Sequence, residues 1–231
     1  MKELIDLVNE HLDEYLQITY PEDIFKAMKY TLMLPGKRLR PVMCLETARI
    51  LGCDIKKVMP AACAIEMLHV QSLIHDDLPC MDNDDFRRGK PSNHKMFGEA
   101  NAVLAGDALL TFAPQLIIEK SKDLSMTQIV RILHEYTKFA GAYGLIAGQV
   151  VDIESEGGKY IKSQVETLDF IHLNKTAVLF RLAVRIGAIA AGADDETINK
   201  FDDFAKKFGL AFQLSLIPIS EPTRRVVISY A

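Results

Sequence analysis

The chain has 231 residues, with 27 basic and 31 acidic side chains and a formal net charge of -4. Hydrophobic residues make up 49% of it and charged residues 25%, a balance that excludes an intrinsically disordered chain. The mildly acidic total, without a basic block, argues against a nucleic-acid-binding protein. The four cysteines lack zinc-type spacing and indicate reduced thiols in a cytoplasmic protein.

Nearly every segment up to about residue 213 predicts helix. In the first, an apolar residue recurs every four positions from Leu4 to Leu16 and forms one stripe. A second helix opens at Pro21 and ends before the breaker at Pro35. Further helices are expected over 41–51, 55–79, 97–119, 126–147, 163–191 and 195–208.

Two segments, 59–78 and 177–191, are apolar around most of their circumference and are expected at the centre of a bundle. Arg181 and Arg185 interrupt the second, so we expect no membrane span, which needs roughly 18 apolar residues. A strand signal is expected only at 226–228. The prediction is a single all-α bundle.

An acidic cluster follows the first of these apolar segments directly, with five aspartates between residues 76 and 85. Asp76 lies two helical turns after His69, so both side chains project from the same face. Mg2+ favours a few carboxylates plus phosphate oxygens. Arg87 and Arg88 follow at once, which indicates a metal-bridged phosphoanion. A self-neutralising surface loop is the alternative interpretation.

Two further elements suit an anion. Residues 36–41 form a glycine-containing loop with three cations that leads into an apolar helix, a combination that holds anions, although solvated helix starts share it. Lys175 precedes the apolar helix at 177, where Thr176 equally suits an N-cap. Gln149 and Asp152 are candidates to face the same cavity, with structural roles as the alternative.

In combination, these motifs resemble the trans-polyprenyl diphosphate synthases, most closely the bacterial farnesyl and geranylgeranyl diphosphate synthases. Residues 76–82 are similar to that family's first aspartate-rich motif, in the form with two extra residues before the last aspartate. Other family motifs match in order within about residues 1–213, at 36–41, 66–69, 87–91, 104–107, 148–152, 175–176 and 211–213. The fold implied is an isoprenoid-synthase-like helical bundle.

The resemblance implies a prenyltransferase that uses Mg2+ to condense isopentenyl diphosphate with an allylic diphosphate, either dimethylallyl or geranyl. The metal and catalytic residues it implies are Asp76, Asp77, Asp82, Arg87 and Lys175. The residues expected to hold isopentenyl diphosphate are Gly36, Lys37, Arg40, His69 and Arg88. The residues expected on the allylic side are Arg87, Lys175, Thr176, Gln149, Asp152 and Gln213.

Product length is expected to depend on Gln71 and Ser72, which occupy the positions one turn below the first motif that limit the product in this family. We favour farnesyl diphosphate. Because Gln71 is not aromatic, geranylgeranyl diphosphate stays open. The resemblance also implies a homodimer.

The segment after Gln213 departs from the family pattern. A second aspartate-rich motif is expected there, but no aspartate follows Asp203. We therefore expect a polyprenyl synthetase domain over 1–213, incomplete at its C-terminus, and a non-family tail over 214–231. The tail resembles a translated DNA-library adapter, which suggests a sequencing or assembly artefact. The chain as written is expected to have little prenyltransferase activity.

Two other classes compete with this interpretation. A non-catalytic prenyl-synthase-like subunit has no need of the complete acidic and arginine motif at 76–88. A terpene cyclase on the same architecture has no need of an isopentenyl site, so Lys37, Arg40 and His69 argue against it.

Overall fold

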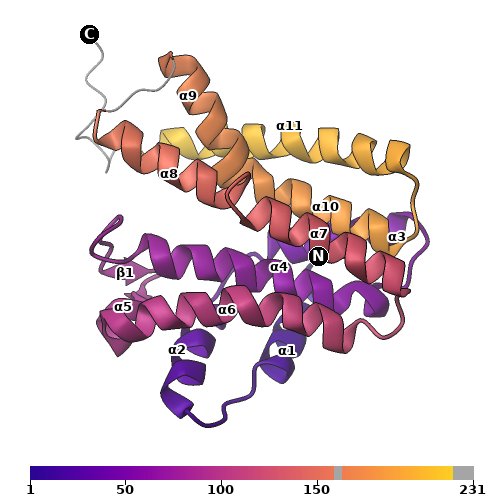
Figure 1. Ribbon diagram of the computed structural model, residues 1–231, viewed down its shortest axis with the longest axis horizontal. Coiled ribbons are helices and arrows are strands. Elements are labelled where there is room, and N and C mark those ends of the chain that lie inside the picture. The colour runs from indigo at the N-terminus through magenta and orange to yellow at the C-terminus, as the bar shows by residue number, and fades with distance from the viewer. Residues whose placement is uncertain (159–162, 221–231) are drawn as a thin grey trace.

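The computed structural model describes residues 1–158 and 163–220 (Figure 1). Its helices are α1 (Lys2–Tyr15), α2 (Glu22–Leu32), α3 (Leu39–Ile50), α4 (Ile55–Asp76), α5 (Asn93–Phe97), α6 (Glu99–Lys120), α7 (Met126–Ala140), α8 (Leu145–Glu156), α9 (Gln164–Ile171), α10 (Val178–Ala190) and α11 (Asp195–Ser220). A π-helical segment, η1 (His172–Ala177), joins α9 to α10, and a short hairpin pairs β1 (Phe86–Arg87) with β2 (Lys90–Pro91). The prediction of an all-α fold is confirmed.

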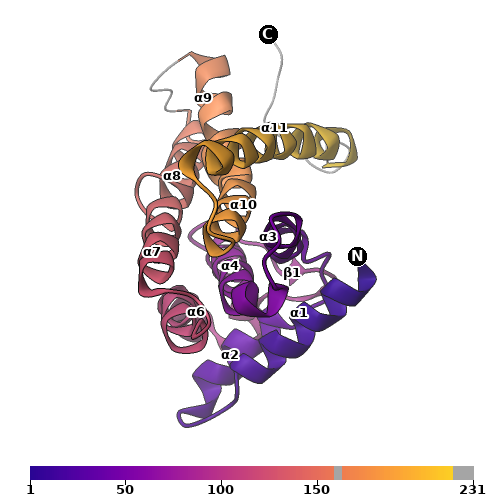
Figure 2. The same cartoon turned by 90° about the vertical axis from the view of Figure 1, so that its right-hand side faces the viewer.

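The interior of the bundle is built around α4, which contacts α1, α2, α3, α6, α7 and α10 (Figure 2). Asp54 caps it by accepting a hydrogen bond from the backbone N–H of Lys56 at 3.0 Å. All its side chains from Val58 to Leu68 are buried, and α10 is buried almost as completely. Both helices therefore occupy the interior, as their all-round apolar sequences predict.

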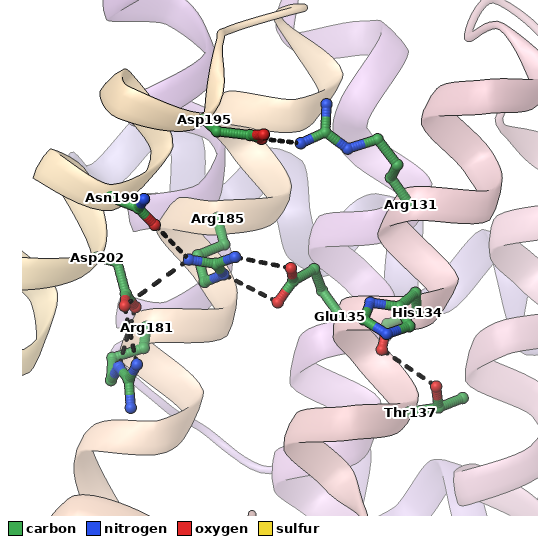
Figure 3. A network of polar contacts seen from close by, with 9 residues as sticks. All are labelled: Arg131, His134, Glu135, Thr137, Arg181, Arg185, Asp195, Asn199 and Asp202. Atoms are coloured by element: carbon green, nitrogen blue, oxygen red, sulfur yellow. Dashed lines mark hydrogen bonds and ion pairs between the residues drawn. The ribbon is translucent and has the colours of Figure 1, made fainter.

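The two arginines of α10 are the exception to its apolar surface, and each pairs with a carboxylate of a neighbouring helix (Figure 3). Arg185 donates to both oxygens of Glu135 on α7, at 2.7 and 2.8 Å. Arg181 donates to both oxygens of Asp202 on α11, at 2.8 and 2.9 Å. These forked pairs satisfy charges within a packed region and tie three helices together.

The single helix predicted over 126–147 is wrong. The structure has α7 and α8, separated by a turn at 141–144 that carries a glycine at each end. At Gly144 a Cβ atom would lie 2.1 Å from the carbonyl oxygen of Phe139, so only glycine fits this turn. Two glycines within four residues also make helix continuation unfavourable.

Other boundaries differ less. The predicted helix over 163–191 is helical throughout but contains η1, so Thr176 lies inside a continuous helix and is not an N-cap. α6 continues through Pro114, and α11 extends beyond its predicted end at 208. The β1–β2 hairpin was not expected, and the predicted strand at 226–228 falls outside the described residues.

One described helix, α6, is long and apolar enough to cross a membrane by length and composition. The sequence analysis had instead taken 177–191 as the longest apolar candidate. Core helices of globular bundles pass the same test, and α6 packs against α2, α4, α5 and α7.

Candidate active site

The acidic motif lies at the C-terminal end of α4. Asp76 is the last residue of this helix, and a turn over residues 78–81 returns the chain so that the backbone N–H of Asp82 donates to the carbonyl oxygen of Asp76 at 2.8 Å. The two extra residues of the motif are accommodated in this turn, where Met81 N–H donates to Leu78 O at 2.9 Å. The two ends of the motif are therefore neighbours.

Burial raises the pKa of Asp76 to about 6, and the nearby Asp82 carboxylate adds to the shift while Lys175 opposes it. Lys175 lies on η1 and bonds Asp152 of α8 at 2.5 Å. Although burial works against it, the Asp76 and Asp152 carboxylates raise the pKa of Lys175, which stays charged. One ammonium group, that of Lys175, thus offsets part of the negative charge of Asp76 and Asp82, and the remaining charge suits a further cation.

Asp77 has a different environment from Asp76. Its side chain is 1% exposed, and Arg87 on β1 bonds it through Nε, at 3.0 and 3.1 Å from the two carboxylate oxygens, and through Nη2. The hydrogen bonds that Arg87 donates to the Asp77 carboxylate raise the pKa of Arg87. Asp84 accepts a further bond from Arg87 at 3.3 Å. This forked contact fixes the guanidinium beside the acidic turn.

A cationic group lies beside the start of α3. Arg88 Nη1 donates to the carbonyl oxygen of Leu34 at 3.2 Å. A Cβ atom on Gly36 would lie 2.5 Å from that same Nη1, so the glycine leaves room for the guanidinium. Arg40 lies over the Phe180 ring at 4.8 Å, and burial lowers its pKa to about 10. Lys37, the remaining predicted cation, is exposed.

His69 lies on α4, close enough to these cations for their charges to act on it. Burial lowers the pKa of His69 well below 6.5, and the surrounding arginines, Arg40 and Arg88 foremost, lower it further. The imidazole is therefore neutral at physiological pH and offers hydrogen bonds rather than charge.

The segment η1 forms the third side of the site. A glycine on α8 and another on α11 allow these two helices to pack closely against it. A Cβ atom on Gly148 would lie 2.5 Å from the backbone nitrogen of Lys175, and one on Gly209 would lie 2.6 Å from Ala177 Cα. Thr176 Oγ1 donates to Gln213 Oε1 of α11 at 3.0 Å. The structure thus brings four of the predicted allylic-side residues, Asp152, Lys175, Thr176 and Gln213, together around one π-helical turn, a feature common at functional sites, while Arg87 lies on β1.

Two buried donors in this region have no hydrogen-bond partner within the described part of the chain: Arg40 Nε and Gln149 Nε2. Buried polar groups are nearly always bonded, so unpaired donors among cations suit an oxygen-rich anion. Among residues 1–158 and 163–220, no three His, Cys, Asp or Glu side chains converge into a metal cage.

The predicted chain-length residues are both hydrogen-bonded. Gln71 is buried, and its amide donates to His75 Nδ1 at 3.1 Å, while His75 Nε2 donates to Val103 O of α6 at 3.1 Å. Ser72 Oγ donates to the carbonyl oxygen of His69 at 2.8 Å. Gln71 is therefore held toward α6 by its neighbour one turn further along α4.

The sequence analysis did not assign roles to Arg38 and Glu66, which form an ion pair at 2.7 Å with side chains 1% and 2% exposed. A signal was present, because a glutamate inside an otherwise apolar, buried helix requires a partner. The identity of that partner, 28 residues away, was not readable from spacing.

The sequence of the chain is similar to those of known proteins. A model of the family described as polyprenyl synthetase matches residues 21–215. The chain belongs to the polyprenyl synthetase family. The chain is 51% identical over 211 residues to "Heterodimeric geranylgeranyl pyrophosphate synthase large subunit 1, chloroplastic" of Arabidopsis thaliana, covering 90% of this chain and 57% of that protein. It is 45% identical to the "Dimethylallyltranstransferase" of Fischerella ambigua, covering 90% and 59%.

Solved structures of similar proteins have the same fold as this chain. An FPP/GFPP synthase from Zymomonas mobilis superposes with a TM-score of 0.89 at 32% identity, covering 95% of this chain and 81% of that one. A geranyltranstransferase from Thermotoga maritima superposes with a TM-score of 0.82 at 35% identity, covering 96% and 79%. The chain spans somewhat over half the length of these curated relatives.

Proposed function

We propose that the protein is a short-chain all-trans prenyl diphosphate synthase, which joins isopentenyl diphosphate to an allylic diphosphate. The observation that carries this proposal is the position of Asp76 and Asp82 beside Lys175 and Arg87, next to a second group formed by the cations Arg40 and Arg88 and the neutral His69. One group suits the diphosphate that leaves and the other suits the diphosphate that is retained.

In this proposal Arg87 and Lys175 stabilise the negative charge that develops on the allylic diphosphate as its C–O bond breaks. Lys37, Arg40, Arg88 and neutral His69 orient isopentenyl diphosphate so that its double bond attacks the allylic carbon, after which a proton is lost. The buried apolar faces of α4 and α10 keep water from the carbocation. Gln149, Thr176 and Gln213 complete the allylic side.

We propose Asp76 and Asp82 as the residues that hold Mg2+. Their adjacency and the raised pKa of Asp76 fit a hard cation. We assign Asp77 to the same acidic centre through Arg87, which its carboxylate holds. When bound, Mg2+ supplies Lewis-acid stabilisation of the leaving diphosphate.

For the product we propose geranylgeranyl diphosphate, with farnesyl diphosphate, which the sequence analysis favoured, as the alternative. Several relatives at 42–51% identity are named geranylgeranyl synthases, whereas the similar solved structures are named as an FPP/GFPP synthase and a geranyltranstransferase. Gln71 is not aromatic and is held toward α6 by His75, which leaves more room below the acidic motif than a ring would.

We also propose a homodimer that pairs through α6. This helix exposes Leu104 (55%) and Ile118 (58%), and neighbouring α7 exposes Val130 (58%). Two relatives are named as large subunits of heterodimers, so light scattering of the chain alone is the appropriate measurement. We propose a cytoplasmic location, against the plastid location in the names of several relatives.

The test is incubation of the purified chain with Mg2+, isopentenyl diphosphate and either dimethylallyl or geranyl diphosphate, with mass spectrometry of the products. Formation of C20 or C15 diphosphate supports the proposal and decides between the two lengths. Binding of both diphosphates without any product would instead favour the non-catalytic subunit. Absence of binding to either diphosphate would refute the assignment of the site.

A further inference from the structure

The buried ion pair of Arg38 and Glu66 lies beneath the cationic group at the start of α3. Arg38 uses every part of its guanidinium within the protein. Its bonds run from Nη1 to Glu66 Oε1 at 2.7 Å, from Nε to Asn9 Oδ1 at 2.9 Å, and from Nη2 to the carbonyl oxygens of Leu32 at 2.8 Å and Leu34 at 3.1 Å. Four of its five N–H groups are thus bonded within the protein, and its side chain is only 1% exposed, so Arg38 is not placed to contact a diphosphate.

The carbonyl oxygen of Leu34 links this ion pair to the site. It accepts from Arg38 Nη2 at 3.1 Å and from Arg88 Nη1 at 3.2 Å. Arg38 also has a positive φ of 46°, in the left-handed region that a non-glycine residue adopts only when its surroundings hold it there. The bonds of Arg38 thus fix the loop at 32–38, and this loop in turn fixes the Arg88 guanidinium.

The charge of Glu66 acts on the same cations. Burial lowers the pKa of Arg40 and of Arg88, and the Glu66 carboxylate is the largest opposing influence on both. A cluster of arginines without a counter-charge is costly in a buried site. Glu66 provides that counter-charge while it accepts a hydrogen bond from Arg38.

We infer that Arg38 and Glu66 form a positioning pair for the isopentenyl diphosphate subsite, an inference that rests on the proposed function. The pair holds Arg88 through Leu34 O and offsets the charge of Arg40, so that both guanidinium groups are in place before the anion arrives. Neither residue contacts the substrate. Such preorganisation raises affinity without adding a contact.

The test separates positioning from folding with the double variant R38M/E66L. Replacing both members of a buried pair by apolar residues of similar size often leaves stability unchanged. The matched control is R185M/E135L, which removes another largely buried ion pair, the forked pair between α7 and α10. Titration calorimetry would measure isopentenyl diphosphate and, separately, geranyl diphosphate with Mg2+, and thermal unfolding would be recorded for each variant.

We expect R38M/E66L to bind isopentenyl diphosphate about tenfold more weakly and geranyl diphosphate within about twofold of the unsubstituted chain, whereas R185M/E135L changes neither affinity. The conservative variant R38K, which keeps the charge but not the fork, is expected to show an intermediate loss and serves if the double variant does not fold. Unchanged isopentenyl affinity in these variants, or equal losses for both diphosphates, would overturn the inference. If the unsubstituted chain binds neither diphosphate, the proposed function itself fails.

Discussion

Gly148 lies where α8 crosses η1, and its replacement by alanine should disable the site through the backbone. The added Cβ would lie 2.5 Å from Lys175 N and 2.6 Å from Asn174 C. These are backbone atoms, which cannot rotate away as a side chain can. Ordinary contacts begin at 3.4 Å, so α8 and η1 must separate by about 1 Å.

The energetic cost follows from two opposing effects. Overpacking of this kind costs about 1–3 kcal/mol, while Gly148→Ala in a helix gains up to about 1 kcal/mol in helix propensity. The net loss of about 1–2 kcal/mol corresponds to a fall of about 2–8 °C in melting temperature for a chain of this size. The functional effect is larger, because the Lys175–Asp152 bond at 2.5 Å spans the same two helices. A displacement of about 1 Å costs on the order of 100-fold in rate.

The assay measures thermal unfolding together with the dissociation constant for geranyl diphosphate and, where turnover of the chain is detectable, kcat/KM for the same substrate. Gly157→Ala is the matched control, since Gly157 ends the same helix with φ of -73° and an added Cβ would lie 3.6 Å from Glu154 O, an ordinary contact. Gly157→Ala should therefore leave these quantities nearly unchanged. Equal behaviour of the two variants would refute the argument that the α8–η1 crossing positions Lys175.

Three further predictions concern the diphosphate side. Gly36→Ala should displace the Arg88 guanidinium and weaken isopentenyl diphosphate binding about tenfold without lowering the melting temperature, as calorimetry and thermal unfolding can check. Because its pKa is lowered in the fold, His69 binds a proton more readily in the unfolded chain, so the free energy of unfolding should fall as pH drops below 6.5. Urea titrations of H69Q should show a shallower fall with pH. An identical fall in both proteins would contradict a neutral imidazole in the folded state. Asp77→Asn removes one partner of a buried forked pair and should destabilise the protein by about 3 kcal/mol while freeing Arg87; chemical denaturation measures the loss, and a change under about 1 kcal/mol would show that the pair is weak.

Local sequence patterns predict most of the helices and the position of the charged motifs. The all-round apolar character of 59–78 and 177–191 predicts two central helices, and α4 and α10 occupy those positions. The acidic run at 76–85 ends α4 as expected. These features depend on side chains a few residues apart, so periodicity and capping reveal them.

The break between α7 and α8 was also open to sequence analysis, since Gly141 and Gly144 lie within four residues. It was missed because the flanking apolar pattern continues on both sides. The packing around the π-helical turn at η1, by contrast, depends on Gly148 and Gly209. These glycines lie on α8 and α11 and allow those helices to pack closely against η1.

Tertiary structure alone decided how the charges are divided among the site residues. Sequence analysis treated Asp76, Asp77 and Asp82 as one metal set and Arg38 as one of three loop cations. In the fold, Asp77 bonds Arg87 and Arg38 bonds Glu66. A buried charge requires a partner wherever the chain can bring one, and that partner is set by helix packing over long sequence separations. The sequence therefore determined which charged residues gather near the end of α4, and packing determined which of them are paired within the protein.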